Sequence, residues 1–351
     1  MRLLLVDPAC FTPQYDHELA SALVRSGIDV ELLTSRFRFG ETPPPDGYMR
    51  SEVFYPVSNR IFGRSRARLP LKAAEHGVGL VRIRSRRGSI VHHQWLAAPE
   101  IDNRVLRMLR PTVFTAHDLL PRRTARKREL WGKLLRRFSA VVVHSEHGRR
   151  TIEELGVEPG RLRVIPHPVF SSDHERPDDG ATVLALGVIR PYKGLDDSIA
   201  AVKRLDGARL LVVGDPLEPV ERYRSEAPES TEWRLGYASE ADVDRALGES
   251  TLAVFPYKPE IDQSGALLRA LGAGVPVVAY DVGGIAEPVR RFEAGRVVEA
   301  GNVEALAEAM RELLSDRDAL ERARAGARRA REELTWDASA AAHSELYREL
   351  V

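Results

Sequence analysis

Short apolar segments alternate with helical patterns along almost the whole chain of 351 residues, and this alternation restricts the fold more than any other feature. The apolar segments are continuous and rich in Leu and β-branched residues. Strands of this kind are typical of parallel sheets covered by helices on both faces. The predicted strands are 3–6, 30–34, 90–94, 113–117 and 141–145 in the first half, and 183–188, 210–214, 252–257, 276–280 and 296–298 in the second. The helical patterns between them include 17–25, 148–155, 195–205, 240–247 and 303–314.

The alternation is interrupted at 166–180, a stretch rich in Pro, Asp and Gly that we interpret as a linker. A chain of this length is expected to form two domains of roughly 100–200 residues each. We predict an α/β protein with two facing, doubly wound domains, over 1–172 and 173–333. Ligands of such folds bind at the carboxyl ends of the strands, so the cleft between the two halves is the expected site.

The last segment, 334–351, is predicted to be a separate helix. Ala338, Ala342, Leu346 and Leu350 recur there every four residues. This spacing places them on one face of a helix, which we expect to be buried against another part of the protein.

The composition is ordinary for a soluble globular protein, with 43% hydrophobic and 29% charged residues. The single cysteine, Cys10, excludes an intramolecular disulfide framework and favours a reducing compartment. No apolar run is as long as a membrane span, and the N-terminus leads directly into a predicted strand rather than into a signal peptide. We therefore expect a cytoplasmic protein.

The charge is unevenly distributed, although the net charge is only +1. Residues 60–138 contain 20 Lys and Arg against 5 Asp and Glu, which indicates an anionic partner for the first half. The densest segment, 122–137, has the pattern of a basic amphipathic helix. Both a solvated face and peripheral contact with the inner face of a membrane are compatible with it. We do not expect nucleic-acid binding, because no nucleic-acid module accompanies the charge.

The first of two informative turns in the second half runs from Gly187 through Arg190 and Lys193 to Gly194. An arginine can contact two phosphate oxygens, a lysine acts as a point charge, and a helix N-terminus favours an anion. The glycine lets the backbone approach a ligand. The turn therefore suits a diphosphate, although an ordinary surface turn has the same residue types.

The second turn supplies a carboxylate, an amide and a hydroxyl from Asp262, Gln263 and Ser264, followed by the N–H groups of Gly265 and Ala266. This mixture of donors and acceptors suits the hydroxyls of a sugar as well as a phosphate. Asp262 or Ser264 is also a suitable N-cap for the helix that follows, and capping does not exclude ligand contact.

Histidines end several predicted strands of the first half. His117 closes the strand 113–117 and is followed by Asp118, and His92, His93 and His144 lie at the ends of neighbouring strands. A histidine there can hydrogen-bond a substrate hydroxyl. Each one alone is also a common structural residue, and it is their repetition at one edge that favours a site.

Two kinds of site are not expected from the sequence. No Cys/His cluster or pair of carboxylates has the spacing of metal ligands, so we predict no metal site. The fingerprint G-x-G-x-x-G does not follow the first predicted strand, which argues against a dinucleotide-dependent dehydrogenase.

The chain resembles the family 4 glycosyltransferases over nearly its whole length. The motifs that support the resemblance are 115–118, 141–145, 164–168, 187–194, 254–257, 272–279, the pair 283–284 with Glu287, and Trp336 with Tyr347. The resemblance implies a retaining enzyme with two Rossmann-like domains, the GT-B fold. It also implies a nucleotide sugar on the C-terminal domain, an acceptor on the N-terminal domain, and a final helix that crosses back to the first domain.

The resemblance also implies roles for individual residues. It places Arg190 and Lys193 at the donor diphosphate and His117 at the donor sugar, and we predict these three as the catalytic residues. On the acceptor side we place His92, His93 and Asp118. The predicted donor-binding residues are Gly187, Arg190, Lys193, Gly236, Tyr237, Asp262, Gln263, Ser264, Gly265, Ala266 and Arg269.

The sequence departs from the family pattern at two places. The usual pair of glutamates falls on Ile261 and Arg269, and the arginine that usually follows the first glycine falls on Val188, with Arg190 two positions later. The second glutamate of the family usually binds the ribose, and Arg269 cannot accept protons from hydroxyl groups. Ribose recognition is therefore the part of the site that the resemblance leaves open.

From these observations we expect a hexosyltransferase that uses a UDP- or GDP-linked sugar as co-substrate, with no other cofactor and no metal. The acceptor is expected to be a glycan, a lipid-linked compound or a small molecule. Two other interpretations remain open. One is a glycosyltransferase-like accessory protein without activity, and the other is a nucleotide-sugar 2-epimerase.

Overall fold

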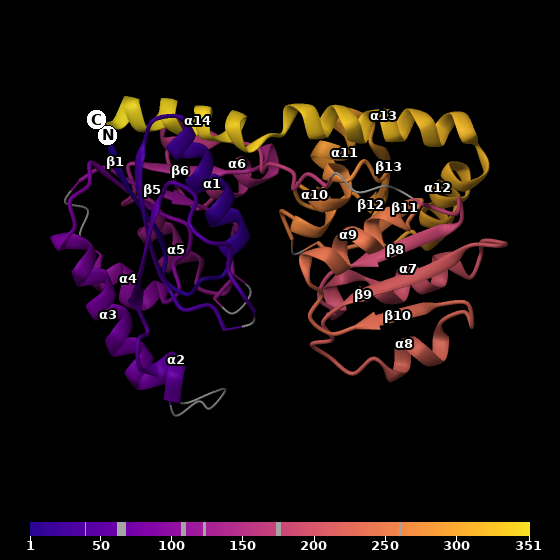
Figure 1. The fold of residues 1–351 in the computed structure, drawn as a ribbon, viewed down its shortest axis with the longest axis horizontal. Helices are drawn as coiled ribbons and strands as arrows, with labels where there is room; N and C mark the ends of the chain where they lie inside the picture. Colours follow the sequence, from indigo (N-terminus) through magenta and orange to yellow (C-terminus); the bar gives the residue numbers. More distant parts are fainter. Residues whose placement is uncertain (39, 62–67, 107–109, 122–123, 173–176, 260) are drawn as a thin grey trace. The chain divides into compact units, whose positions relative to one another are not determined.

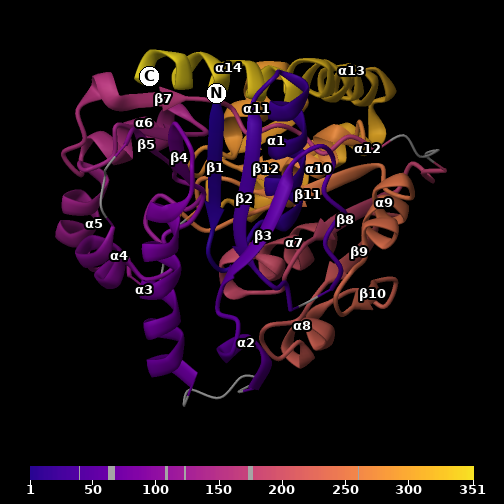
Figure 2. The ribbon, with the colours of Figure 1, turned by 60° about the vertical axis from the view of Figure 1, so that its left-hand side comes forward.

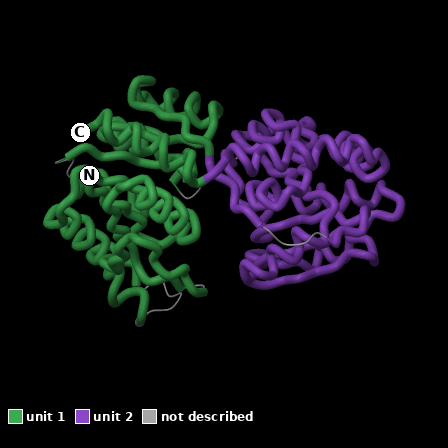
Figure 3. The backbone as a smooth tube through the Cα atoms, turned by 45° about the horizontal axis from the view of Figure 1, so that its top comes forward, with its two compact units in different colours: residues 1–166, 336–351 green, residues 167–335 purple. Residues whose placement is uncertain are grey.

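The computed structural model describes residues 1–351 apart from 39, 62–67, 107–109, 122–123, 173–176 and 260. It divides into two compact units (Figure 3). Unit 1 comprises Met1–Pro166 together with Trp336–Val351, and unit 2 comprises His167–Thr335. Residues after Pro166 join unit 2 because Val169 is buried in its core and donates its N–H to the carbonyl of Leu334 at 2.9 Å. This division enters the second unit six residues before the expected boundary at 172/173.

Seven parallel strands form the sheet of unit 1, in the order β3-β2-β1-β4-β5-β6-β7 (Figure 2). The order reverses between β1 and β4, as in other doubly wound folds. The strands are β1 (Arg2–Asp7), β2 (Asp29–Ser35), β3 (Met49–Phe54), β4 (Ile90–His93), β5 (Thr112–Thr115), β6 (Ala140–Val143) and β7 (Leu162–Val164).

Helices cover both faces of this sheet, because alternate residues of each strand point to opposite sides. Leu3 and Leu5 pack in a cluster with α1 and α14, whereas Leu4 and Val6 pack in a second cluster with α3 and α5. The helices of unit 1 are α1 (Pro13–Arg25), α2 (Ser58–Ile61), α3 (Leu69–Ser85), α4 (Pro99–Val105), α5 (Arg128–Leu135), α6 (Glu146–Glu153) and α14 (Trp336–Leu350).

The C-terminal helix α14 returns to unit 1, as expected, and lies beside α1 (Figure 1). Leu346 and Tyr347 are buried, and the Tyr347 hydroxyl lies 2.6 Å from Nδ1 of His92. At the other end of the helix, Arg25 and Asp337 form an ion pair of 2.6 Å. Helix α14 is therefore part of the core of unit 1.

Unit 2 contains the second parallel sheet, in the order β10-β9-β8-β11-β12-β13. Its strands are β8 (Thr182–Leu186), β9 (Arg209–Gly214), β10 (Glu232–Leu235), β11 (Leu252–Phe255), β12 (Val277–Tyr280) and β13 (Gly295–Val298). Its helices are α7 (Leu195–Val202), α8 (Glu221–Glu226), α9 (Glu240–Gly248), α10 (Gly265–Gly272), α11 (Ala286–Phe292), α12 (Val303–Ser315) and α13 (Arg317–Glu333). The predicted pair of doubly wound parallel sheets is confirmed.

Only Arg128–Leu135 of the basic segment 122–137 form a helix, α5, whose apolar face is covered; residues 122–123 lie outside the described residues. Trp131, Leu134 and Leu135 are buried in the core of unit 1. Arg137 donates to the carbonyls of Asn103 and Leu106. A membrane contact through this segment would therefore depend on its charges. None of the helices in the described part of the chain is long and apolar enough to span a bilayer.

Two carboxyl groups are buried together where β1 meets α1. Asp7 and Asp16 are hydrogen-bonded to each other, and Asp7 also accepts the backbone N–H groups of Phe11 and Thr12. Burial raises the pKa of both carboxyl groups, and the neighbouring charge of Asp7 raises the pKa of Asp16 further. The pair therefore favours a state in which Asp16 holds a proton and donates it to Asp7.

We predict that the Asp16→Asn variant loses less stability than the wild type as the pH rises. The folded pKa of Asp16 lies above its usual value of 3.8, so the folded state binds this proton more tightly than the unfolded state. Its contribution to stability is present below that usual value and is lost as the pH rises through the raised pKa. The neutral Asn side chain keeps the donor without titrating.

Urea unfolding at several pH values measures this difference, with Asp46→Asn at an exposed position as the control. The unfolding free energy of the wild type minus that of Asp16→Asn should fall steadily with rising pH. A difference that is independent of pH would contradict the shared proton.

Candidate functional site

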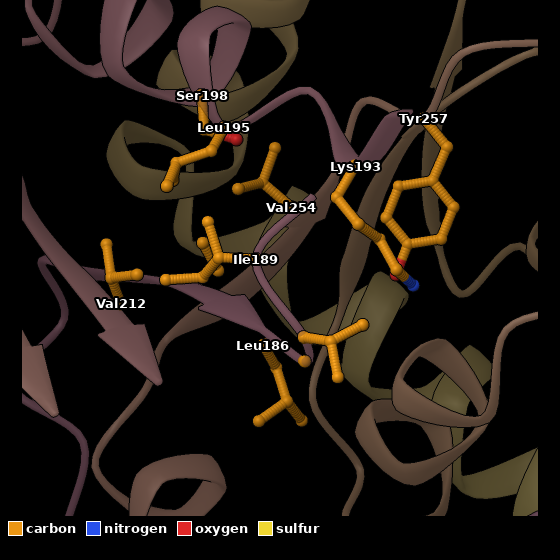
Figure 4. A pocket seen from close by; sticks show the side chains of 11 residues that line it. Leu186, Ile189, Lys193, Leu195, Ser198, Val212, Val254 and Tyr257 are labelled. Carbon is orange, nitrogen blue, oxygen red and sulfur yellow. The ribbon is translucent and has the colours of Figure 1, made fainter. Parts of the chain in front are cut away.

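The strand order of unit 2 reverses between β8 and β11, which are neighbours in the sheet. At such a point the loops after the two strands leave in opposite directions and form a crevice where ligands bind. A small pocket lies there, lined mainly by apolar side chains of β8, β9 and α7, with Lys193 and Tyr257 among its lining residues (Figure 4). Both informative turns of the sequence analysis follow these two strands.

A close approach at Gly194 brings the two loops together. Gly194 has φ +66°, and a Cβ atom at this position would lie 2.0 Å from the carbonyl oxygen of Pro256. Backbone contact between the loops continues where Lys258 donates its N–H to the carbonyl of Tyr192 at 2.8 Å. Gly194 was expected to let the backbone approach a ligand, and in the structure its missing side chain makes room for Pro256.

Lys193 begins a chain of hydrogen bonds between the loops, with Tyr257 at its centre. Its Nζ donates to the hydroxyl of Tyr257 at 2.6 Å and lies 3.8 Å from the centre of the Tyr257 ring (Figure 4). The Tyr257 hydroxyl is in turn 3.0 Å from Oγ of Ser264. Because burial raises the pKa of Tyr257, its hydroxyl stays neutral and can donate its proton to Ser264 while it accepts from Lys193.

Ser264 is the N-cap of α10 and accepts the N–H of Leu267 at 3.3 Å. Next to it, Gly265 is exposed, and a Cβ atom added there would have no neighbour within 4 Å. There is therefore free space beside Gly265 at the first turn of α10, where the unpaired N–H groups and the positive end of the helix dipole lie. The predicted cap has formed, and it leaves the helix N-terminus accessible to an anion.

Arg190 adds a second cation. Hydrogen bonds of the neighbouring backbone hold its position in the loop, whereas its side chain extends into solvent. The residue before it, Ile189, donates its N–H to Asp215 and accepts the N–H of Leu217. The Arg190 side chain is exposed and forms no ion pair with any residue that the structure describes. Unit 2 therefore presents a guanidinium that is unpaired among the described residues, an ammonium and a helix N-terminus on the loops that follow β8 and β11.

The remaining predicted donor residues differ in their surroundings. Asp262 is buried and Gln263 is half-buried, both in the loop before α10. The loop between β10 and α9 contains Gly236, with φ +126°, and the exposed ring of Tyr237. Arg269 is paired with Glu240, a residue that the sequence analysis did not single out.

In unit 1, His117 follows β5 and is held by three neighbours. Its Nδ1 lies 3.3 Å from Nε2 of His144, and its Nε2 lies 2.8 Å from the side-chain oxygen of Gln94. The ring of Trp95 stacks on the imidazole at 5.2 Å and 21°. His144 is neutral, since burial lowers its pKa to about 4, and its Nδ1 donates to the carbonyl of Ile165. Nε2 of His144 therefore accepts a hydrogen bond from the Nδ1–H group of His117.

Gln94 and Trp95 were missed as partners of His117. The signal for them was present in the sequence, because they follow β4 directly and β4 lies beside β5 in the sheet. Parallel strands that are neighbours end at the same edge. Asp118 lies next to His117 and is exposed.

The burial of His92 and His93 does not fit their assignment to the acceptor side. His92 bonds to Tyr347 and to Oγ1 of Thr115, and the ring of His93 packs on Phe138. Burial lowers the pKa of His93 to about 3 and that of His92 well below its usual value. Both are neutral core residues because α14 and Phe138 cover the strand that they end. Within the described residues, no group of three or more His, Cys, Asp or Glu is arranged to hold a metal ion.

Two family models match the chain. Residues 14–172 match the model described as Glycosyltransferase Family 4, and residues 180–316 match the model described as Glycosyl transferases group 1. Among curated relatives, the D-inositol 3-phosphate glycosyltransferase of Acidothermus cellulolyticus is 26% identical over 335 residues, which cover 81% of this chain and 73% of the relative. A GDP-mannose-dependent alpha-(1-6)-phosphatidylinositol monomannoside mannosyltransferase of Mycobacterium tuberculosis is 31% identical over 186 residues, which cover 45% of this chain and 48% of that protein.

Solved structures are similar over the full chain. Sucrose-phosphate synthase from Thermosynechococcus elongatus has a TM-score of 0.81 at 19% identity and covers 100% of this chain and 99% of its own. Anabaena HepE in complex with UDP-glucose has a TM-score of 0.76 at 15% identity and covers 100% of both chains. At these identities the likeness shows a shared fold.

We predict that Gly194→Ala lowers the unfolding free energy of unit 2 by more than the strain of an alanine in the left-handed conformation alone explains. A left-handed conformation costs a residue other than glycine about 1–3 kcal/mol, and the collision with Pro256 adds to this. Gly180→Ala is the matched control, because Gly180 has φ +75° but a Cβ atom there would have no neighbour within 4 Å. Urea unfolding of both variants separates the two effects. Equal losses of unfolding free energy would contradict the steric role of Gly194.

Proposed function

The chain belongs to the family 4 glycosyltransferases, retaining enzymes that here have the GT-B fold, and we propose that it transfers a hexosyl group from a nucleotide diphosphate sugar to an acceptor hydroxyl. The observation that carries the proposal is the link from Lys193 through Tyr257 to Ser264 at the N-terminus of α10, with Arg190 exposed three residues before Lys193 on the same loop. The two cations and the helix N-terminus favour negative charge, and a diphosphate is the anion that suits their number.

In the proposed reaction, the bond between the anomeric carbon and the diphosphate breaks with its electron pair on the phosphate oxygen. The acceptor oxygen then bonds to the same face of the sugar, and its proton passes to the departing phosphate. Negative charge therefore grows on the diphosphate in the transition state. The side chains of Arg190 and Lys193 and the N–H groups of Gly265 and Ala266 are placed to stabilise this charge.

The other proposed residues hold the two substrates. Ser264 and Gln263 lie beside the helix N-terminus, where the sugar hydroxyls of a bound donor need hydrogen-bond partners. His117 remains our proposal for a contact with the donor sugar; because its two ring nitrogens face His144 and Gln94, a sugar hydroxyl would have to replace the side-chain oxygen of Gln94 at Nε2. Asp118 remains our proposal for a contact with the acceptor.

The names of similar proteins support a UDP- or GDP-linked hexose. One relative is named as GDP-mannose-dependent, and one similar structure holds UDP-glucose. Relatives named for D-inositol 3-phosphate and for a phosphatidylinositol mannoside support a small or lipid-linked acceptor with a phosphate group. The excess of Lys and Arg in residues 60–138 is compatible with such an acceptor.

We predict that UDP or GDP, but not both equally, stabilises the protein in a thermal-shift panel that also includes ADP. A nucleotide at about 100 times its dissociation constant stabilises the folded state by about 2.7 kcal/mol. The shift should be absent or much smaller in Arg190→Ala and unchanged in Arg328→Ala, which removes an exposed arginine of α13. A panel without any shift in the wild type would favour the accessory protein.

We predict further that Arg190→Ala together with Lys193→Ala lowers kcat for glycosyl transfer by about 100-fold or more. Removing a group that stabilises growing charge typically costs a factor of about 100 to 1,000. Initial rates with the nucleotide sugar identified in the panel measure this effect. Glycosyl transfer at the wild-type rate would exclude the electrostatic role of the two cations.

A further inference from the structure

The ion pair between α9 and α10 is a feature of unit 2 that the proposed chemistry does not use. Nη1 of Arg269 lies 2.5 Å from Oε2 of Glu240, and Nη2 lies 3.0 Å from Oε1. The guanidinium thus holds both carboxylate oxygens at once, which fixes the plane of the carboxylate. Glu240 is the first residue of α9 and directly follows the loop that contains Gly236 and Tyr237.

The ring of Phe170 packs against the guanidinium of Arg269. The guanidinium carbon lies 4.4 Å from the centre of the Phe170 ring, and the side chain of Arg269 is 18% exposed, whereas that of Glu240 is 61% exposed. An ion pair with one partner so exposed contributes at most about 1 kcal/mol to stability. The arrangement therefore does little for the fold, and its main effect is to present a carboxylate to solvent in a fixed orientation.

The carboxylate has free acceptor capacity. Each of its two oxygens offers two lone-pair sites, and the guanidinium of Arg269 occupies one on each. Two sites remain, one on the outer side of each oxygen, and they point away from each other. Either site can accept one ligand hydroxyl, such as the 2′- or the 3′-hydroxyl of a ribose.

The location along α10 fits a ribose. The diphosphate is proposed to bind at Gly265, and a rise of 1.5 Å per residue places Arg269 about 6 Å further along the helix axis. The ribose of a nucleoside diphosphate is attached directly to the α-phosphate, so its hydroxyls lie a few bonds from the helix N-terminus. The exposed ring of Tyr237 lies three residues before Glu240 and offers a flat apolar surface for the base that the ribose carries.

We propose that Glu240, positioned by Arg269, accepts a hydrogen bond from a ribose hydroxyl of the donor nucleotide. This inference rests on the proposed function, because it needs a nucleoside diphosphate on unit 2. It also suggests how the ribose is recognised although Arg269 stands where the family usually has a glutamate. The charge at this position of α10 is reversed relative to the family pattern, and the arginine recruits a carboxylate from α9 in place of the missing one.

Binding of two ligands to two proteins tests the proposal. The ligands are the nucleoside diphosphate that the thermal-shift panel identifies and its 2′,3′-dideoxy analogue, and the dissociation constants are measured by titration calorimetry. The wild type should bind the ribonucleotide about tenfold more tightly than the analogue, since hydrogen bonds to a charged group are lost with the hydroxyls. In Glu240→Gln this preference should shrink to about twofold or less, with the affinity for the analogue nearly unchanged.

A second variant tests the positioning role of Arg269. Arg269→Met keeps an apolar side chain on Phe170 but releases Glu240, so it should also lose most of the preference for the ribonucleotide while it binds the dideoxy analogue as the wild type does. Glu304→Gln is the matched control, because Glu304 is an exposed glutamate of α12 that is paired with Arg204. This control should keep the full preference.

Other outcomes overturn the proposal, and they can be told apart. If Glu240→Gln weakens binding of both ligands equally, or of neither, the ion pair has no role in recognising the ribose, and the proposed function stands. If the wild type binds neither ligand, the proposed function itself fails, and the proposal for Glu240 fails with it.

Discussion

The absence of a side chain at Gly194 allows two loops of unit 2 to meet, and the arrangement of the donor site depends on this contact. With the carbonyl of Pro256 in the space of a Cβ atom, Lys193 reaches across to Tyr257. Tyr257 contacts Ser264, and Ser264 caps the helix whose N-terminus is open. One backbone contact therefore sets where a lysine, a tyrosine and a helix end lie relative to one another.

The cations of unit 2 differ in how much of their charge is available. Arg190 is exposed and has no ion-pair partner among the described residues, and Lys193 donates to the neutral phenol of Tyr257. Arg269 is neutralised by Glu240. The same residue type thus serves two purposes, and the difference arises from which side chains pack around each arginine rather than from the arginines themselves.

Many elements of the fold could be predicted because their signals are local. The strand 3–6 is a continuous apolar run and is buried on both faces. The four-residue spacing from Ala338 to Leu350 predicted the last helix but not its buried side, since Ala338 is exposed and the buried residues are Ser339, Ala340, His343, Ser344, Leu346 and Tyr347. The strands β3, β7 and β10 were not predicted. Residues 49–54, 162–164 and 232–235 are partly exposed and include charged side chains, so no apolar run marks them. Their strand conformation comes from pairing with β2, β6 and β9.

The sequence by itself determined the class of the fold, the order of its elements and the presence of cations and a capped helix after the strands of the second half. These properties follow from the residue types and from their spacing over a few neighbouring positions, which can be read directly from the sequence. Only the tertiary structure decided which of these residues are accessible. His92 is enclosed by α14, which is more than 240 positions away along the chain, and the apolar side of α5 faces the core instead of solvent. The pairing of Glu240 with Arg269 was also decided by the tertiary structure. Burial and charge pairing depend on contacts between segments that are far apart in the chain, and local sequence patterns do not reveal such contacts.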